Sequence, residues 1–411
     1  MAMMVLHGGR FLDPRQDALR DGVEVLIEDN RVREVSDTPI RAAGAERIDV
    51  RGRTVMPGLI DAHVHMYMNE MNVGLLRNVP PTYAAAKAAF VLKGMLMRGF
   101  TSVRDMGGGD YGMRDAAEAG YVETPRLFVS GRAISQTGGH GDFRLRPDSR
   151  RTDWVCCSAL DVFSIVADGL PEVLKAVRDE LRKGADHIKV MLSGGVASPY
   201  DPLDSLQYRM DEIEAVVEEA TRWGTYVGGH AYSDEAIRRG VTAGIRTVEH
   251  GNFIEPPTAA LMAERGALLV PTLITYRMNK VLGAASGKTP ASLAKNDIVH
   301  DAGLASLEIC RAAGVPIGFG TDLSMHTQKY QCDGLAIHRE VMSAAEVIRS
   351  ATLVNARILR REGELGELVS GALADLLVVD GDPYADLGLF QEGGPNIAAI
   401  MKDGRFHRNA L

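Results

Sequence analysis

Eight short apolar segments, separated by stretches of helical periodicity, constrain the fold of this chain more than any other feature. They lie at residues 55–62, 101–105, 126–133, 186–192, 225–230, 245–250, 267–272 and 315–321. Strands that alternate with helical patterns are typical of βα units and of a parallel sheet. Eight such units in roughly 300 residues predict an α/β fold, a (β/α)8 TIM barrel.

The boundaries of one unit can be read directly from the residues. A helix predicted over residues 171–183 begins with Pro171 and is followed by Gly184. Proline in the first turn and glycine after the last are the expected asymmetry of a helix. The next helix is predicted to begin at Asp211, with Glu214 three residues later completing a capping box.

The two ends of the chain have a different sequence pattern, in which short runs of strand-forming residues are joined by turns. The predicted strands there are residues 23–27, 31–35, 374–379 and 397–401. Asp29 and Asn30 separate the first two runs and are typical of a hairpin turn. We therefore expect a small β-sandwich domain, built from residues 1–57 and 366–411, beside a barrel domain of residues 58–365.

Composition excludes several classes of protein. The net charge of −8 argues against a nucleic-acid surface, which needs clustered Lys and Arg. The sequence contains no apolar run of the roughly 18 to 20 residues needed to cross a bilayer. Its start does not resemble a signal peptide. The four cysteines form no Cys-x-x-Cys pair. So few cysteines fit a reducing compartment, and we expect a cytoplasmic protein.

Residues that bind metals recur at the C-terminal ends of the predicted strands, where barrels of this kind carry their active sites. They are His63 and His65 on the first strand, Lys189 on the fourth, His230 on the fifth, His250 on the sixth and Asp322 on the eighth. His63 and His65 are two apart and so share one face of their strand. Taken singly, a strand-end histidine is usually only a hydrogen-bonded polar residue, and Asp322 could cap a helix. Together the four histidines and Asp322 predict a metal site.

In this order, on these strands, the motifs resemble the amidohydrolase superfamily of metal-dependent hydrolases. The resemblance covers the whole chain and implies two divalent metal ions, for which we expect Zn²⁺. It implies that His63, His65 and Asp322 hold one ion, that His230 and His250 hold the second, and that Lys189 bridges them as a carbamate. Two nearby cations repel an ammonium and need a shared anion, which carboxylation of the lysine would supply. The alternative is a structural or substrate-binding Lys189.

The resemblance also implies a reaction. Metal ions that share a water lower its pKa, so we expect hydrolysis of a carbon–nitrogen bond. Asp322 would act both as ligand and as the general base that returns a proton to the leaving nitrogen. The chain is most similar to the imidazolonepropionase-related group, which includes dipeptidases that release proline, or arginine and lysine. Residues 137–142, 189–195 and 230–232 carry this likeness. It implies that His140 and Tyr232 contact substrate and bind the carboxylate of the product, although both residues could simply be structural.

The substrate class follows from the loop after the eighth strand. Residues 323–329 contain no carboxylate for a cationic side chain, which favours proline release over arginine or lysine release. Asp201 and Asp204 remain candidates for a cationic pocket. We therefore expect a small-molecule substrate, an Xaa-Pro dipeptide or N-acyl-proline, and a homo-oligomer with no nucleic-acid or membrane partner. The alternatives are a cyclic amide hydrolase like imidazolonepropionase and a non-catalytic scaffold, against which the full ligand set weighs.

Two longer segments and one further histidine complete the expectations. Residues 142–170 and 274–296 could be lids over the site or surface loops. His187 lies two residues before Lys189 and is expected to face the same side in a deeper layer, in the core. The remaining histidines considered, His7, His300, His338 and His407, are expected to be structural or exposed.

Overall fold

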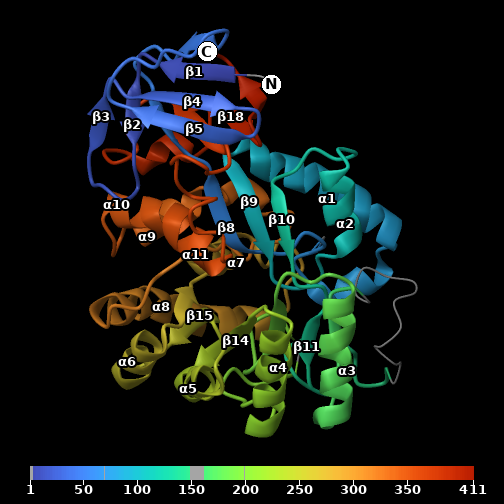
Figure 1. Ribbon diagram of the computed structural model, residues 1–411. Helices are drawn as coiled ribbons and strands as arrows, with labels where there is room; N and C mark the ends of the chain where they lie inside the picture. Colours follow the sequence, from blue (N-terminus) through green and yellow to red (C-terminus); the bar gives the residue numbers. More distant parts are fainter. Residues whose placement is uncertain (1–2, 69, 149–161, 199) are drawn as a thin grey trace.

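The chain folds into a larger α/β part and a smaller group of strands that holds both termini (Figure 1). The computed structural model describes residues 3–68, 70–148, 162–198 and 200–411. The expected α/β class, with parallel sheets, is confirmed. Within the described residues, no helix is long and apolar enough to cross a membrane.

Two parallel sheets form the framework of the larger part, in the orders β10-β9-β8 and β12-β11-β13-β14-β15-β16. Their strands are β8 (Leu59–Val64), β9 (Phe100–Asp105), β10 (Arg126–Val129), β11 (Ala133–Ser135), β12 (Ser164–Val166), β13 (Ile188–Met191), β14 (Val227–Ser233), β15 (Thr247–Phe253) and β16 (Leu268–Val270). Because every paired neighbour is parallel, the carboxyl ends of the strands in each sheet meet at one edge.

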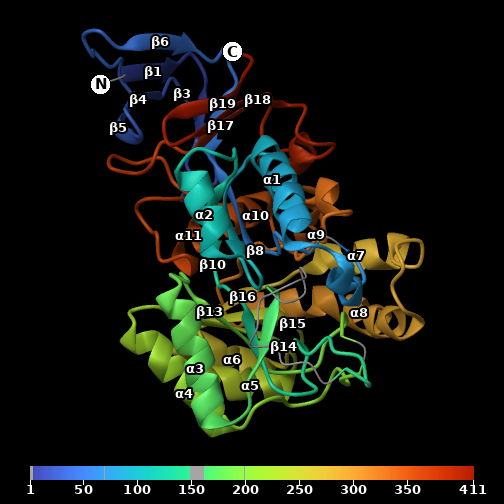
Figure 2. The same ribbon diagram turned by 90° about the vertical axis from the view of Figure 1, so that its right-hand side faces the viewer.

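Helices follow most of these strands and cover the sheets (Figure 2). They are α1 (Pro81–Met97), α2 (Tyr111–Glu118), α3 (Gly169–Arg182), α4 (Met210–Arg222), α5 (Asp234–Ala243), α6 (Pro256–Arg265), α7 (Leu273–Leu282), α8 (Pro290–Ala312), α9 (Asp333–His338), α10 (Ala344–Arg349) and α11 (Asn355–Ile358). The capping box predicted at Asp211 and Glu214 is wrong. Helix α4 begins earlier, and the Glu212 carboxylate accepts a hydrogen bond from the Arg209 backbone N–H at 2.9 Å.

The predicted strand at residues 55–62 is in fact two strands. β7 (Thr54–Pro57) pairs with the C-terminal strand β17 (Leu376–Val379), whereas β8 pairs with β9. Gly58 lies at the break, and a Cβ atom there would come within 2.1 Å of the Thr101 hydroxyl oxygen. A glycine is therefore required where the chain passes from one sheet to the other. Residues 126–133 divide similarly, between β10 and β11.

The predicted strand at residues 315–321 is reduced to a single bridge between Ile317 and Leu269. Its backbone is satisfied differently, because the Asn355 side chain both accepts from the Phe319 N–H and donates to the Phe319 carbonyl. The segment still lies between the two sheets. Ala62 of β8 donates to the Phe319 carbonyl at 2.9 Å, and Gly318 donates to the Leu269 carbonyl of β16 at 2.8 Å.

The smaller part consists of two further sheets, in the orders β5-β4-β1-β6 and β19-β18-β17-β7-β2-β3. Their remaining strands are β1 (Met3–His7), β2 (Arg10–Leu12), β3 (Leu19–Asp21), β4 (Glu24–Glu28), β5 (Arg31–Ser36), β6 (Glu46–Asp49), β18 (Ile397–Lys402) and β19 (Arg405–Asn409). The hairpin predicted at Asp29 and Asn30 is confirmed, with Asp29 at a φ of 53°. The six-stranded sheet β19-β18-β17-β7-β2-β3 combines strands from both ends of the chain.

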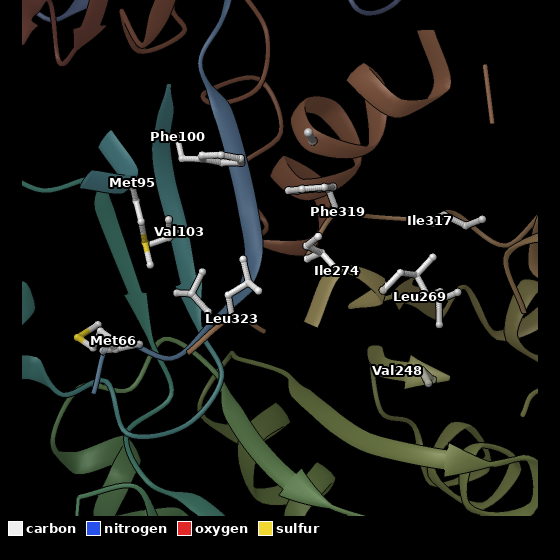
Figure 3. Packing of buried hydrophobic residues seen from close by; sticks show 14 of the residues in the cluster. Met66, Met95, Phe100, Val103, Val248, Leu269, Ile274, Ile317, Phe319 and Leu323 are labelled. Atoms are coloured by element: carbon white, nitrogen blue, oxygen red, sulfur yellow. The ribbon is translucent and has the colours of Figure 1, made fainter. Parts of the chain in front are cut away.

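The main core of the α/β part lies between its helices and the strands that carry the site (Figure 3). Phe100 of β9 stacks on Phe319, with ring centroids 5.9 Å apart and the rings inclined by 14°. Met95 of α1 and Val103 of β9 belong to the same buried cluster. This packing fixes the segment that leads into Asp322 against the first two strands of the sheet.

Candidate metal centre and substrate pocket

All eight predicted site residues line one cavity. They are His63, His65, His140, Lys189, His230, Tyr232, His250 and Asp322. Most of them sit at the carboxyl ends of parallel strands, in both sheets. The structure thus brings together residues that lie more than 250 positions apart in the sequence.

His63 and His65 approach Asp322 from β8. The Nδ1 atom of His63 lies 2.8 Å from Glu249 Oε2, and the Nδ1 atom of His65 lies 2.9 Å from the Gly107 carbonyl oxygen. Both acceptors favour a proton on Nδ1, which leaves Nε2 with a free lone pair. The two Nε2 atoms lie 3.7 and 3.2 Å from the same oxygen of Asp322.

His250 and Asp322 complete this group, although their backbones are unusual. His250 has a φ of 76° and Asp322 a φ of 52°, in the region that normally favours glycine. Such strain concentrates at functional sites, where the surrounding structure maintains it. One ligand atom each from His63, His250 and Asp322 lies within 4.8 Å of the others. Donor atoms this close together suit a site for metal ions.

His230 extends the cluster along β14. Its ring centroid lies 4.5 Å from that of His250 and 4.1 Å from that of His140, on which it stacks. Its Nε2 atom lies 3.2 Å from the Gly194 carbonyl oxygen, so Nδ1 is its free nitrogen. Burial, followed by the charge of His140, lowers the pKa of His230 well below its ordinary value. The imidazole is therefore neutral, as a metal ligand must be.

The two charged residues of the predicted centre are held in unusual states. Burial opposes the charge of Asp322, yet the adjacent His65 and His63 imidazoles bring the pKa of this carboxyl well below its usual range. Lys189 is 1% exposed, and burial lowers the pKa of its ammonium to about 8. A substantial neutral fraction at mild pH is a precondition for reaction of the amine with carbon dioxide.

The sequence reasoning missed the buried pair that orients His63. The Arg104 guanidinium binds both oxygens of Glu249, at 2.8 and 3.0 Å, and both side chains are inaccessible to solvent. Burial works against the Glu249 charge, but Arg104 and His63 hold the pKa of its carboxyl well below the usual range. The available signal was a glutamate inside an apolar strand, directly before a strand-end histidine.

Asp61 was also missed, and it joins the strand of His63 to the segment that precedes Asp322. Its carboxylate accepts from the Thr321 hydroxyl at 2.6 Å and from the Gln331 amide at 2.9 Å. It also accepts from the backbone N–H groups of Thr321 and His63. Burial raises the pKa of Asp61 to about 6 in spite of these bonds.

A chain of hydroxyls leads from His250 to Tyr232. The Thr272 hydroxyl lies 2.7 Å from His250 Nδ1, and the Tyr276 hydroxyl lies 3.0 Å from the hydroxyls of both Thr272 and Tyr232. If His250 uses Nε2 as a ligand, its Nδ1–H donates into this chain. The Tyr232 hydroxyl can then accept from Tyr276 and direct its own proton into the cavity.

His140 is held from behind and faces the same cavity. Its Nδ1 atom lies 2.7 Å from the Ser198 hydroxyl and 3.4 Å from an Asp201 oxygen. A Cβ atom on Gly195 would come within 2.1 Å of the His140 ring, so only glycine fits beneath it. Asp201 thus supports His140, and neither it nor Asp204 lines the cavity.

The remaining walls are mainly apolar. They include Met68, Met71, Val73, Phe143, Phe163, Met191, Val196 and Ala197. Among the described residues that line the cavity, Asp322 is the one carboxylate. The predicted lid at 142–170 is bracketed by Phe143 and Phe163, while its residues 149–161 lie outside the described part. The segment 274–296 is mostly helical and contributes Thr275, Tyr276, Asn279 and Lys288 to the wall.

The donor set fits divalent metal ions. The pattern of partnered and free histidine nitrogens, with one ionised carboxylate, is that of a metal-dependent hydrolase in which first ligands are oriented by a second layer of hydrogen bonds. The neutral state of buried His230 and His250 agrees with this. Fold and site together therefore define the class of the protein, a metal-dependent hydrolase with an α/β framework.

Comparison with known proteins identifies the family. Residues 54–406 match the model of the amidohydrolase family, and the chain belongs to this family. It is similar to a crystal structure of an amidohydrolase at 50% identity, with a TM-score of 0.97 and complete coverage of both chains. It is also similar, at 45% identity and a TM-score of 0.96, to a prolidase complexed with N-methylphosphonate-L-proline, covering 99% of this chain and 100% of that one.

A more distant relative carries a different name. The ochratoxinase of Aspergillus niger is 29% identical, over 98% of this chain and 86% of its own length. The chain is therefore a hydrolytic enzyme that acts on carbon–nitrogen bonds, within a family whose members differ in substrate.

Proposed function

We propose that the protein is a binuclear metal-dependent dipeptidase that releases C-terminal proline from Xaa-Pro dipeptides and N-acyl-prolines. The observation that carries this proposal is the cavity wall, which is mainly apolar outside the predicted site residues and in which, among the described residues, Asp322 is the one carboxylate. Such a wall suits the apolar ring of proline. Release of arginine or lysine would place a cation against it without a counter-charge. The similarity to a prolidase complex supports the same choice.

The proposal assigns the ligands as the sequence predicts. His63, His65 and Asp322 would hold one ion, and His230 and His250 a second, with carboxylated Lys189 between them. Bound Zn²⁺ ions would lower the pKa of a water and polarise the scissile carbonyl. We infer as well that the two parallel sheets and residues 316–319 form one (β/α)8 barrel, supported by the hydrogen bonds of Phe319 and Gly318 to both sheets.

The protein groups have separate tasks in this mechanism. Asp322 is ionised, and its oxygen faces the histidine cluster, so it can accept a proton from the attacking water. It would return that proton to the proline nitrogen, which must be protonated to leave. Tyr232 would donate a hydrogen bond toward the substrate from the end of its hydroxyl chain.

The decisive experiment is an assay of the Zn²⁺-loaded enzyme against a library of dipeptides, N-acyl amino acids and cyclic amides. We expect kcat/KM to be highest for Xaa-Pro and N-acyl-proline. Failure to cleave any proline derivative would overturn the substrate proposal while leaving the hydrolase class intact. Preferential cleavage of cyclic amides would instead support an enzyme like imidazolonepropionase.

The proposed general base is tested by Asp322→Asn. Loss of a general base typically lowers the rate about 10²- to 10⁴-fold. We expect kcat to fall by that factor, with the metal content of the variant measured in parallel. Near-wild-type turnover in a metal-loaded Asp322→Asn protein would contradict the assignment.

A further inference from the structure

Lys288 is a cavity residue that neither the metal centre nor the proposed mechanism uses. It lies in the connection between α7 and α8 and lines the same cavity as the histidines. Its backbone N–H donates to the Gly283 carbonyl at 3.0 Å, and the next residue, Thr289, caps α8 by accepting from the Ser292 N–H. The base of the side chain is therefore fixed at the cavity wall.

The ammonium of Lys288 has no acceptor in the part of the chain that the structure describes. Two neighbouring lysines differ in this respect. Lys295 donates to three backbone carbonyls, and Lys280 lies near Asp297 and Asp301 at 4.0 and 3.6 Å. For Lys288, burial lowers the pKa of its ammonium to about 8, although the charge of Asp322 acts in the opposite direction.

Lys288 is half-buried, and a cation partly withdrawn from water without an acceptor is costly unless a ligand supplies the counter-charge. Asp322 is a poor permanent partner for Lys288, because its oxygen is already within 3.2 Å of His65 and belongs to the predicted metal ligands. An anionic group on the bound substrate would satisfy the ammonium. Every dipeptide and N-acyl amino acid carries such a group, the free carboxylate of the residue that is released.

We propose that Lys288 binds the free carboxylate of the leaving amino acid and so restricts the enzyme to substrates with an unblocked C-terminus. This inference rests on the proposed dipeptidase function. It adds the residue whose positive charge binds the carboxylate of the substrate. His140 and Tyr232 offer hydrogen bonds from the same cavity, and a carboxylate can accept from several donors at once. The salt link and the orientation that it gives are the contribution of Lys288.

The test compares each substrate with its own carboxamide. Wild type, Lys288→Met, Lys288→Arg and the control Lys280→Met, on the outer side of α7, are assayed with Xaa-Pro and Xaa-Pro-amide. We expect Lys288→Met to lower kcat/KM for the acid about 10- to 100-fold, the usual effect of losing a hydrogen bond to a charged group. The carboxamide should change less than about 3-fold on the same reasoning. Lys288→Arg should retain part of the preference for the acid, and Lys280→Met all of it.

The outcomes separate this inference from the proposed function. If Lys288→Met lowers kcat/KM equally for acid and carboxamide, or leaves the acid preference unchanged, the role of Lys288 is wrong while the dipeptidase stands. If the wild type cleaves other N-acyl amino acids but no proline derivative, the proline proposal fails and the acid–amide comparison is made on those substrates. If the wild type shows no preference for acids at all, the inference about Lys288 is overturned. Thermal melting and metal content of each variant show that it is folded and loaded.

Discussion

At the scale of single residues, the chemistry of the cavity depends on which nitrogen of each histidine is free. His63, His65 and His250 each present Nδ1 to an oxygen of the protein, at 2.7 to 2.9 Å. Each of these partners orients one ring. Of the three partners, Glu249 is the one that carries a charge, and it is itself held by Arg104. It should therefore have the largest influence on metal affinity.

We predict that Glu249→Gln weakens metal binding about 10- to 100-fold, the usual effect of removing such a supporting group. The amide leaves the Arg104 charge without its partner, so unfolding should also become easier by about 3 to 5 kcal/mol. Competition with a chelator measures the affinity, and chemical denaturation measures the stability.

The matched control is Glu180→Gln. Glu180 makes a similar buried pair with Arg132, at 2.8 Å, away from the metal cluster. This variant should lose stability but keep the wild-type metal affinity. Equal metal affinities in Glu249→Gln and wild type would show that His63 does not need its carboxylate partner.

The candidate ligands were predictable because their residue type and their place at strand ends are both visible in the sequence, and the structure brings them to one cavity. Arg104 and Glu249 were not, since a charged residue inside an apolar strand says nothing about the partner that neutralises it. The 2.8 Å contact between them joins residues 145 positions apart, and only the parallel packing of the sheets brings them together.

At the scale of elements, prediction worked where a strand or helix is defined by its own residues. Gly184 marked the end of α3 and Asp29 marked the hairpin between β4 and β5, although α3 begins at Gly169, two residues before the predicted Pro171. It failed for residues 315–321, where the Asn355 side chain, 36 residues further on, accepts from the Phe319 N–H and shares the Phe319 carbonyl with the Ala62 N–H of β8. An apolar run alone does not show that a side chain will replace the neighbouring strand.

The last residue of helix α9, His338, allows the effect of burial on a titratable group to be tested. Its side chain is 1% exposed, and its ring packs against Phe319 with ring centroids 5.4 Å apart. Burial lowers the pKa of His338 to about 4. In the unfolded chain its pKa is about 6.5, so the unfolded state binds more protons between these values and stability falls as the pH falls. From pH 7 to pH 5 this residue should cost about 2 kcal/mol.

Replacement by leucine removes that cost. The free energy of unfolding of His338→Leu should therefore fall less than that of wild type between pH 7 and pH 5, by about 2 kcal/mol, in metal-free protein. His300→Leu, at a partly exposed position on α8, is the control. An identical pH dependence in wild type and His338→Leu would show that the buried ring is protonated in the folded protein.

At the scale of the whole molecule, one strand links the two parts of the chain. Alternate residues of β17 belong to different buried clusters, Leu376 and Val378 to the core of the small β part and Leu377 and Val379 to the main core. That an α/β part lies between two strand-rich ends of the chain was readable from the sequence, because the two kinds of segment differ in their spacing of apolar residues and turns. The shared strand was not, because a continuous apolar run does not show which face meets which core.

The predicted ligands also span the molecule, since His63 and His65 belong to one parallel sheet, His230 and His250 to the other, and Asp322 follows the segment between them. A bound ion should therefore hold the two sheets together and stabilise the folded state, by about 4 kcal/mol when free metal exceeds the dissociation constant 1,000-fold. Removing the metal with a chelator should lower the melting temperature by several degrees, and saturating Zn²⁺ should restore it. His63→Ala should lose most of this metal-dependent rise, whereas His7→Ala, on β1 of the small β part, should keep it. A melting temperature unchanged by chelation, in protein shown to contain metal beforehand, would mean that the ion does not join the sheets.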